Sequence, residues 1–276
     1  MIELPEALTI ARQMNETIGG KRIASGTRGN APHKFAFYTR EPEEYEAIFR
    51  SRTIGEAREH GSQILVPIEE DYVLVLGGGG ERILFHESAA TLPRKHQLSL
   101  SFEDGTHLSV SVQGWGCCQL LTGPELAENR ETRPKGPSPL SDEFSYDYFR
   151  GLFAAIPEGD PRSAKYFVIS QPGIWGVGNG YLQDILFRAG IHPRRRALQI
   201  SEGKQRLLYE ATKLTLRQAA DLGGRDSERD LFNRPGGYRR ILTSEATGRP
   251  CPECGTAIEK ISFLGGASYF CPKCQG

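Results

Sequence analysis

The stretch CPECGTAIEKISFLGGASYFCPKC, residues 251–274, contains two Cys-Pro-X-Cys pairs with sixteen residues between them. Two closely spaced thiolates fit adjacent corners of a tetrahedron, so two such pairs together predict a four-sulfur site of the kind that holds Zn²⁺. The apolar residues between the pairs are enough for a small β-hairpin, which has too little core to fold without the metal. A closed site leaves no position open for water, and we therefore expect one structural zinc ion. The predicted ligands are Cys251, Cys254, Cys271 and Cys274.

The rest of the chain has the composition of a globular protein. Of its 276 residues, 38% are hydrophobic and 25% are charged, as is usual for globular proteins. This length suffices for two ordinary domains in addition to the cysteine-rich hairpin. No apolar segment approaches the length of a membrane span and the first residues lack the basic flank of a signal peptide, so we expect a cytoplasmic protein without a membrane partner. The adjacent pair Cys117–Cys118 is a poor disulfide candidate, which favours a reducing compartment. We expect two buried thiols here, with a redox pair as the less favoured alternative.

The N-terminal part predicts one helix followed by antiparallel strands. Residues 5–18 place apolar side chains along one stripe, begin with a proline and are followed by two glycines, as expected for a helix. Residues 97–112 alternate apolar and polar side chains on both sides of Asp104-Gly105, which is the pattern of a β-hairpin in a half-buried sheet. Apolar runs flank the glycines 77–80 in the same way. A strand and not a helix follows these glycines, so we expect a turn rather than a phosphate-binding loop.

The C-terminal part predicts helices after a linker rich in proline and charge. A helix is expected to start at Ser141, a second to run from an N-cap at Asn179 to Gly190, and a third to cover residues 201–222. The expected fold is α+β, with an N-terminal helix and antiparallel β-sandwich at 1–125, a linker at 126–140, a helical domain at 141–245 and a zinc-ribbon hairpin at 246–276.

Charge is distributed unevenly along the chain although the formal net charge is zero. Residues 161–250 contain 16 Lys and Arg against 8 Asp and Glu, a surplus of 16 − 8 = +8. Such a surplus suits a phosphate backbone as partner, although basic faces are commonly no more than solvated faces.

A glycine-rich string, residues 173–193 (GIWGVGNGYLQDILFRAGIHP), carries the clearest functional signal outside the cysteines. Gly176 and Gly178 allow a tight turn, and the bare amides of the following helix can approach an anion closely, with Asn179 as an added donor. Taken alone, an ordinary helix-turn-helix corner is the more common explanation of such a string.

This string closely resembles the helix-two-turn-helix element of the formamidopyrimidine-DNA glycosylase and endonuclease VIII family. The beginning Glu3-Leu-Pro-Glu6 and the cysteine-rich end resemble that family's two ends, so the resemblance covers the whole chain in order. It implies that residues 141–245 form a helix-two-turn-helix DNA-binding domain. It also implies a protein, expected to be a monomer, that grips damaged duplex DNA and turns the damaged nucleotide into a pocket at the N-terminus. We expect it to associate with the nucleoid when it binds DNA.

The N-terminus departs from the family's pattern. Typical members remove Met and use the exposed proline nitrogen as the nucleophile on the sugar C1′, while the following glutamate transfers protons. Here Ile2 stands at the proline position and Glu3 remains. Because isoleucine hinders removal of Met1, we expect the free amine to be that of Met1, displaced by about 3.5 Å of chain. Glu3, Met1, Ile2 and Glu6 are therefore the candidate catalytic residues, although the two glutamates also suit the first turn of a helix through its dipole.

Several other positions that the family uses for DNA are altered. The family's sandwich lysine aligns with Ser62, its void-filling methionine with Gly78, and the ribbon's phosphate-binding arginine with Gly266. Its wedge loop maps onto residues 113–116, where Trp115 is either a stacking wedge or a turn residue packed on the sheet. The expected DNA-binding residues are Asn179, Lys165, Gly176, Gly178, Trp115 and Arg225, the last in a loop that also suits a solvated connection.

Two functions follow from these departures. The first is a glycosylase that excises a flipped-out damaged base with Glu3 as general acid and base, and whose strand-cleaving lyase activity is weak or absent. The alternative is a catalytically inactive protein that binds abasic or distorted DNA. A zinc-ribbon transcription or RNA-processing factor would account for the cysteines but not for the Glu3–Glu6 beginning.

Overall fold

Two compact units make up the computed structural model, which describes residues 1–31 and 33–276. The first unit joins Met1–Pro134 to Leu222–Gly237, and the second joins Lys135–Asp221 to Tyr238–Gly276. The units divide the chain differently from the predicted boundaries, because the segment Leu222–Gly237 packs with the N-terminal part rather than with the helices around it.

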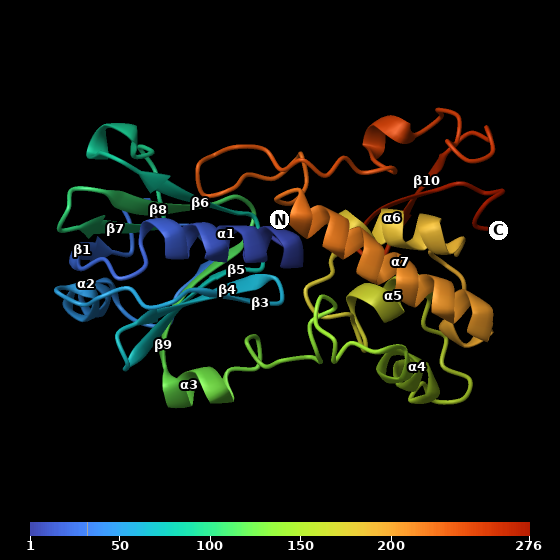
Figure 1. Ribbon diagram of the computed structural model, residues 1–276, viewed down its shortest axis with the longest axis horizontal. Helices are drawn as coiled ribbons and strands as arrows, with labels where there is room; N and C mark the ends of the chain where they lie inside the picture. The colour runs from blue at the N-terminus through green and yellow to red at the C-terminus, as the bar shows by residue number, and fades with distance from the viewer. Residues whose placement is uncertain (32) are drawn as a thin grey trace. The chain divides into compact units, whose positions relative to one another are not determined.

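The first unit is a sandwich of two sheets with helix α1 (Leu4–Thr17) packed along it (Figure 1). One sheet has the antiparallel order β1 (Ile23–Thr27), β7 (Leu98–Phe102), β8 (His107–Val112), β6 (Glu81–His86). The other has the order β2 (Ala36–Phe37), β9 (Gly116–Thr122), β5 (Tyr72–Gly77), β4 (Gln63–Ile68), β3 (Arg58–His60). Its pairs are antiparallel except for the short β2–β9 pair, which is parallel. The remaining elements are α2 (Pro42–Phe49), α3 (Gly123–Glu128) and the 3₁₀ turn η1 (Ala89–Thr91).

The core of this unit lies between the two sheets and α1. The side chains of Leu100 and Val110 from one sheet, Val66 and Leu76 from the other and Met14 from α1 are all completely buried in it. Period-two burial along the strands follows from the alternation of side chains across a pleated sheet.

Because side chains alternate across the sheet, the adjacent residues Cys117 and Cys118 point to opposite faces of it. Cys118 faces the main core, whereas Cys117 belongs to a separate cluster on the other face of the same sheet. Both are buried free thiols, as expected, and burial raises the pKa of Cys117 to about 12.

The glycine run 77–80 is a corner between the sheets and not a hairpin, so the predicted pairing of its flanking strands is wrong. β5 before the run belongs to one sheet and β6 after it to the other. The chain makes a second corner at residues 113–116, and the two corners lie side by side, because Gly80 N–H donates to the Trp115 carbonyl (2.8 Å) and Gln113 N–H to the Gly80 carbonyl (2.7 Å). A Cβ on Gly79 would lie 2.2 Å from the Trp115 carbonyl oxygen, so this close approach requires glycine.

The second unit consists of helices and the C-terminal hairpin. Its elements are α4 (Tyr146–Ala154), α5 (Ala164–Ile169), α6 (Asn179–Ala189), η2 (Ala197–Gln199), α7 (Glu202–Asp221), η3 (Ser244–Ala246), β10 (Glu259–Phe263) and β11 (Gly266–Phe270). The two strands pair antiparallel, and helix α6 packs against both α7 and β11. None of the helices in the described ranges has the length and apolar character needed to cross a membrane.

Two predicted helix starts are wrong by a few residues. Helix α4 begins at Tyr146 rather than Ser141, because the Ser145 hydroxyl caps it by accepting the N–H of Tyr148 (3.1 Å). Helix α6 has Gly178 as its N-cap, so Asn179 is its first helical residue and its side chain is not used for capping. The predicted end at Gly190 is confirmed, since this residue has left-handed backbone angles (φ 62°).

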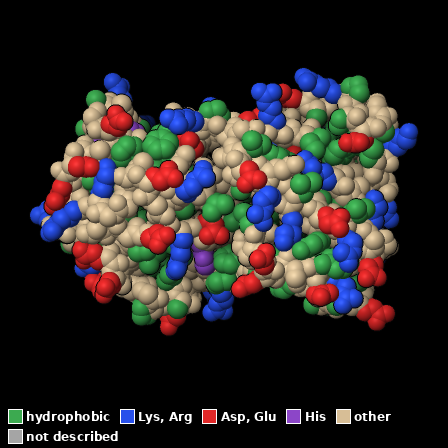
Figure 2. Space-filling model, viewed as in Figure 1, with side chains coloured by type: hydrophobic (Ala, Val, Ile, Leu, Met, Phe, Trp, Pro, Cys, Tyr) green, Lys and Arg blue, Asp and Glu red, His purple; other side chains and the backbone are tan. Residues whose placement is uncertain are grey.

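Basic and acidic side chains are interspersed on the face that Figure 2 shows. On this face, the surplus of positive charge in residues 161–250 does not form a continuous basic patch.

Candidate functional site

The N-terminal residues form a buried cluster at the start of α1. The exposed fractions of Ile2, Glu3 and Glu6 are 3%, 2% and 3%. The N–H of Ile2 donates to the carbonyl of Gly79 (2.8 Å), which ties the first residues to the glycine corner. The N–H of Glu3 donates to a carboxylate oxygen of Glu6 (3.0 Å), as in a capping box, so Glu3 is the N-cap of the helix.

The guanidinium of Arg225 lies between the carboxylates of Glu3 and Glu6. Its Nη1 donates to Glu3 Oε1 (3.0 Å), and its Nε and Nη2 donate to Glu6 Oε1 and Oε2 (3.1 and 3.3 Å). Nη2 also donates to the carbonyl of Met1. Arg225 is only 3% exposed, and the structure places it inside the predicted catalytic cluster.

The amino group of Met1 is engaged in an ion pair. It lies 2.7 Å from Glu228 Oε1, and the same carboxylate oxygen lies 3.8 Å from Nη2 of Arg225. The cluster therefore contains the carboxylates of Glu3, Glu6 and Glu228 against two cations, the guanidinium and the amino group. The sum of these formal charges is −1, which favours a positive charge developing beside the cluster.

The altered pocket positions lie next to this cluster. A Cβ on Gly77 would lie 3.6 Å from the Ile2 side chain, and a Cβ on Gly78 would lie 3.7 Å from the Ser62 hydroxyl oxygen. The two positions where the family has a lysine and a methionine thus adjoin each other here with small side chains. Trp115, the predicted wedge, is 46% exposed at the neighbouring corner.

Glu81 is a buried carboxylate that the sequence analysis did not identify. It is 6% exposed, and its two oxygens accept the backbone N–H groups of Gly79 (2.9 Å) and Cys117. A Cβ on Gly116 would lie 2.7 Å from its side chain, so Glu81 packs tightly against both corners. Burial raises the pKa of Glu81 to about 7, opposed by these hydrogen bonds and by the nearby N-terminal charge.

In the second unit, three predicted positions come together at the hairpin. The Lys165 ammonium donates to the carbonyl of Phe263 (2.7 Å) and to the hydroxyl of Ser268 (3.2 Å), and the Asn179 amide donates to the carbonyl of Ala267 (3.3 Å). A Cβ on Gly266 would lie 3.6 Å from Asn179 Nδ2 and 3.7 Å from Lys165 Nζ.

These two side chains differ in their access to solvent. Lys165 is fully buried, and burial lowers its pKa, whereas Asn179 is partly exposed in the first turn of α6. Gly176 has φ +76° and makes the turn before the helix, and Gly178 caps it. A helix N-terminus flanked by an amide and an ammonium is suited to an anion.

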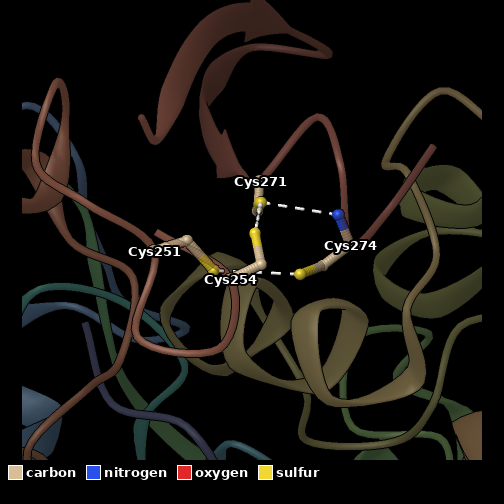
Figure 3. Close-up of side chains that lie close together, drawn as sticks. All are labelled: Cys251, Cys254, Cys271 and Cys274. Atoms are coloured by element: carbon tan, nitrogen blue, oxygen red, sulfur yellow. Dashed lines mark hydrogen bonds between the residues drawn. The ribbon is translucent and has the colours of Figure 1, made fainter. Parts of the chain in front are cut away.

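The four cysteines form the predicted metal site. Their sulfur atoms lie within 4.8 Å of one another, and the side chains converge from the two loops that hold the Cys-Pro-X-Cys pairs (Figure 3). The Cys251–Cys274 and Cys254–Cys271 sulfur distances are 3.8 and 3.5 Å. Four thiolates around Zn²⁺ with bonds of about 2.3 Å place the sulfur atoms about 3.8 Å apart, so the geometry fits the ion.

Glu81 and Glu228 are members of the site that could not be identified from the sequence, for different reasons. Glu81 begins a strand directly after glycines, and only the contact between two corners shows that it is buried. Glu228 is one of several charged residues in a polar segment, and its partner lies 227 residues away in the sequence. For both residues, the neighbouring sequence contains no motif that indicates a place in the site.

Models of three domains match the chain. They are the N-terminal domain of formamidopyrimidine-DNA glycosylase at residues 1–113, the H2TH domain of the same enzyme at 135–230, and the zinc finger found in this enzyme and in isoleucyl-tRNA synthetase at 248–276. The third match and the sulfur geometry agree that the ribbon holds a structural zinc ion.

Similar proteins match over the full length. The formamidopyrimidine-DNA glycosylases of Bacillus licheniformis and Bacillus subtilis are both 31% identical, with 100% of this chain and 99% of each relative covered. The structure of the Thermus thermophilus protein has a TM-score of 0.83 at 28% identity, covering 99% of this chain and 98% of that one. The Lactococcus lactis protein in complex with DNA containing an abasic site has a TM-score of 0.84 at 24% identity, covering 99% of both chains. The chain thus belongs to the formamidopyrimidine-DNA glycosylase family of DNA repair proteins.

Proposed function

We propose that this protein binds damaged duplex DNA and removes a damaged base by hydrolysis, with Glu3 as the residue that transfers protons. The observation that carries this proposal is the buried cluster at the N-terminus, where Glu3 is kept in place although the family's proline is replaced by Ile2. The similar Lactococcus lactis protein has been crystallised with DNA containing an abasic site and with DNA containing an oxidised pyrimidine. Damaged DNA is therefore the partner we propose for this chain.

The proposed reaction breaks the bond between the base nitrogen and the sugar C1′. Positive charge develops on the sugar as the base leaves, and the excess negative charge of the cluster stabilises it. Glu3 accepts a proton from a water molecule, whose oxygen forms the new bond to C1′. The proton then passes from Glu3 to the departing base nitrogen. One water molecule is thus divided between the products, the hydroxyl group going to C1′ of the sugar and the hydrogen to the base.

We propose that strand cleavage by a lyase step is weak or absent. That step begins when an amine attacks C1′, and here no proline amine is present at the usual position. The amino group of Met1 is engaged with Glu228 at 2.7 Å instead. An amino group held in an ion pair must first leave its partner before it can act as a nucleophile.

DNA contacts are proposed for the second unit at the N-terminus of α6. Asn179 and the amides around Gly176 and Gly178 would bind one backbone phosphate, supported by the charge of Lys165 behind them. Trp115 in the first unit is exposed enough to stack on a base at the lesion.

One observation favours the alternative, a binder of abasic or distorted DNA without catalysis. Glu3 is 2% exposed and paired with Arg225, so excision requires the side chains that cover Glu3 to move when DNA binds. A binding protein has no such requirement.

Base release and strand cleavage should be measured separately on duplexes that carry an oxidised purine, an oxidised pyrimidine, an alkylated base or an abasic site. We expect release of at least one damaged base, little strand cleavage, and little covalent adduct after borohydride reduction. Efficient trapping would show that the Met1 amine remains a nucleophile and would overturn the proposed loss of lyase activity. Tight binding of abasic DNA without release of any base would instead support the alternative.

A further inference from the structure

The segment Leu222–Gly237 is held firmly against α1. The Gln13 side chain donates to Asp230 Oδ2 (2.9 Å) and accepts the N–H of Leu231 (2.9 Å). Leu231 is completely buried in the core of the first unit, and its carbonyl accepts the N–H of Phe85 (2.9 Å). The part of the segment around Asp230 and Leu231 therefore belongs to the sandwich of the first unit. In the sequence it follows helix α7, which belongs to the second unit.

Arg225 is anchored at the other end of the same segment. Its backbone N–H donates to Glu6 Oε1 (2.9 Å), so Glu6 binds both the main chain and the side chain of this residue. Gly224 has φ +92°, and a Cβ there would lie 3.0 Å from the Glu6 carboxylate. A Cβ on Gly236 would lie 2.2 Å from the Gly224 carbonyl oxygen, which shows how closely the two ends of the segment pack. The backbone thus fixes the place from which the guanidinium extends.

The guanidinium has little capacity left for a phosphate. Each of its three nitrogens already donates to Glu3, Glu6 or the Met1 carbonyl. A buried arginine in a fork arrangement with a carboxylate is well ordered, because two parallel hydrogen bonds define its plane. Glu6 therefore orients Arg225, and Arg225 in turn binds one oxygen of Glu3.

We propose that Arg225 is a positioning residue that holds the Glu3 carboxylate, charged and correctly oriented, for base excision. The inference rests on the proposed function, since it assigns Arg225 a role in the same site. Arg225 does not touch the substrate in this account. It acts through Glu3, and Glu6 serves as its anchor, which gives a reason for two buried glutamates at the N-terminus rather than one.

The test compares Arg225→Gln and Arg225→Lys with the wild-type protein in single-turnover base release. Arg225→Gln removes the charge, and we expect a rate lower by on the order of 10²-fold, the effect of misplacing a catalytic group by about 1 Å. Arg225→Lys keeps the charge but loses the fork, and should restore part of the rate. Arg50→Gln breaks an exposed ion pair with Glu46 in the same unit and serves as the control.

The pH dependence of the rate separates positioning from a merely structural role. Within the first unit, the charged groups next to Glu3 include Glu6 and Arg225, with Glu228 and the amino group of Met1 beside Arg225. The buried Glu81 lies near the N-terminal charge as well and is common to all the variants. Loss of the arginine charge makes ionisation of Glu3 harder, so the acidic limb of the pH–rate profile should move to higher pH in Arg225→Gln but not in Arg225→Lys or Arg50→Gln. DNA affinity should stay unchanged in all three variants.

The outcomes are distinct. Wild-type rates and pH profiles in both Arg225 variants would overturn the positioning role while leaving the proposed function intact. A loss of DNA affinity with an unchanged rate at saturating protein would show instead that Arg225 contacts DNA. If the wild-type protein releases no base from any duplex, the proposed function fails and this inference fails with it. Should Arg225→Gln not fold, the rate and profile of Arg225→Lys decide, since a wild-type result in that variant excludes a need for the fork.

Discussion

Glu81 is the residue whose ionisation should affect stability most clearly. Burial raises its pKa from the ordinary value of 4.5 to about 7, so the folded protein holds this proton more tightly than the unfolded chain does. The resulting stabilisation is fully present below about pH 4.5 and is lost as the pH rises through about 7. We predict that Glu81→Gln removes this part of the pH dependence, which amounts to up to about 3 kcal/mol in the free energy of unfolding.

Denaturant unfolding at about pH 5 and about pH 8 measures this difference, because linear extrapolation gives the free energy of unfolding at each pH. The exposed residue Glu46 provides the control, because Glu46→Gln should leave the wild-type pH dependence unchanged. An equal loss of stability between the two pH values in Glu81→Gln and the wild-type protein would contradict the prediction.

At the scale of single elements, the sequence predicted those parts in which local pattern and packing agree. The stripe of apolar residues gave helix α1, and the alternation around Asp104-Gly105 gave the β7–β8 hairpin. The glycine corner at 77–80 was mistaken for a hairpin turn because its flanking residues are equally apolar whichever sheet they join. Which sheet each strand joins depends on contacts between residues far apart in the sequence, such as the hydrogen bond between Gly80 and Trp115. A local sequence pattern does not contain this information.

Site residues were likewise predictable from the sequence only where a short motif marks them. The cysteines were identifiable because their spacing is tied to the geometry of a four-sulfur metal site. The Glu3–Glu6 beginning was identifiable only through its resemblance to the family's N-terminus. The partner of Glu3 was not, since Arg225 is 222 residues away and lies in a segment whose composition suits a solvated loop.

The segment Leu222–Gly237 offers a prediction at the element scale. Gln13 makes two hydrogen bonds to it, so Gln13→Ala should leave a buried backbone N–H of Leu231 without its acceptor. We expect a loss of about 1–3 kcal/mol in the free energy of unfolding and faster amide hydrogen exchange throughout Leu222–Gly237. Glu16→Ala, at an exposed position of the same helix, is the matched control. Unchanged exchange in the segment would show that it is held by other contacts.

Zinc removal should act on the C-terminal hairpin and leave the first unit folded. The strands β10 and β11 form a two-stranded sheet with a small buried cluster, which is insufficient for stability without the metal. We expect one zinc ion per chain, and loss of hairpin order and of DNA affinity when a chelator removes it or when Cys274 is replaced by Ser. Metal analysis, hydrogen exchange and DNA titration test this together. A hairpin that stays protected without zinc would contradict the assigned role of the metal.

At the scale of the whole molecule, DNA binding should respond to the small residue at position 266. A Cβ there meets Asn179 and Lys165 at ordinary contact distances, and the backbone angles suit any residue, so Gly266→Arg can be accommodated. We predict tighter binding of duplex DNA and a slope of log affinity against log salt that is steeper by about one, because one more cation reaches a phosphate. Ser262→Arg adds the same charge at an exposed position of the same hairpin and should have a smaller effect. Equal effects of both variants would mean that Lys165 and Asn179 do not mark a phosphate site.

The proposed base excision depends on Glu3 acting without the family's proline. The most direct measurement is single-turnover release of a damaged base by the wild-type protein and by Glu3→Gln, with duplex affinity measured for both. We predict that release falls by on the order of 10²–10⁴-fold in Glu3→Gln while affinity for the damaged duplex is retained. Equal rates in the two proteins, or tight binding without release by the wild-type protein, would contradict it.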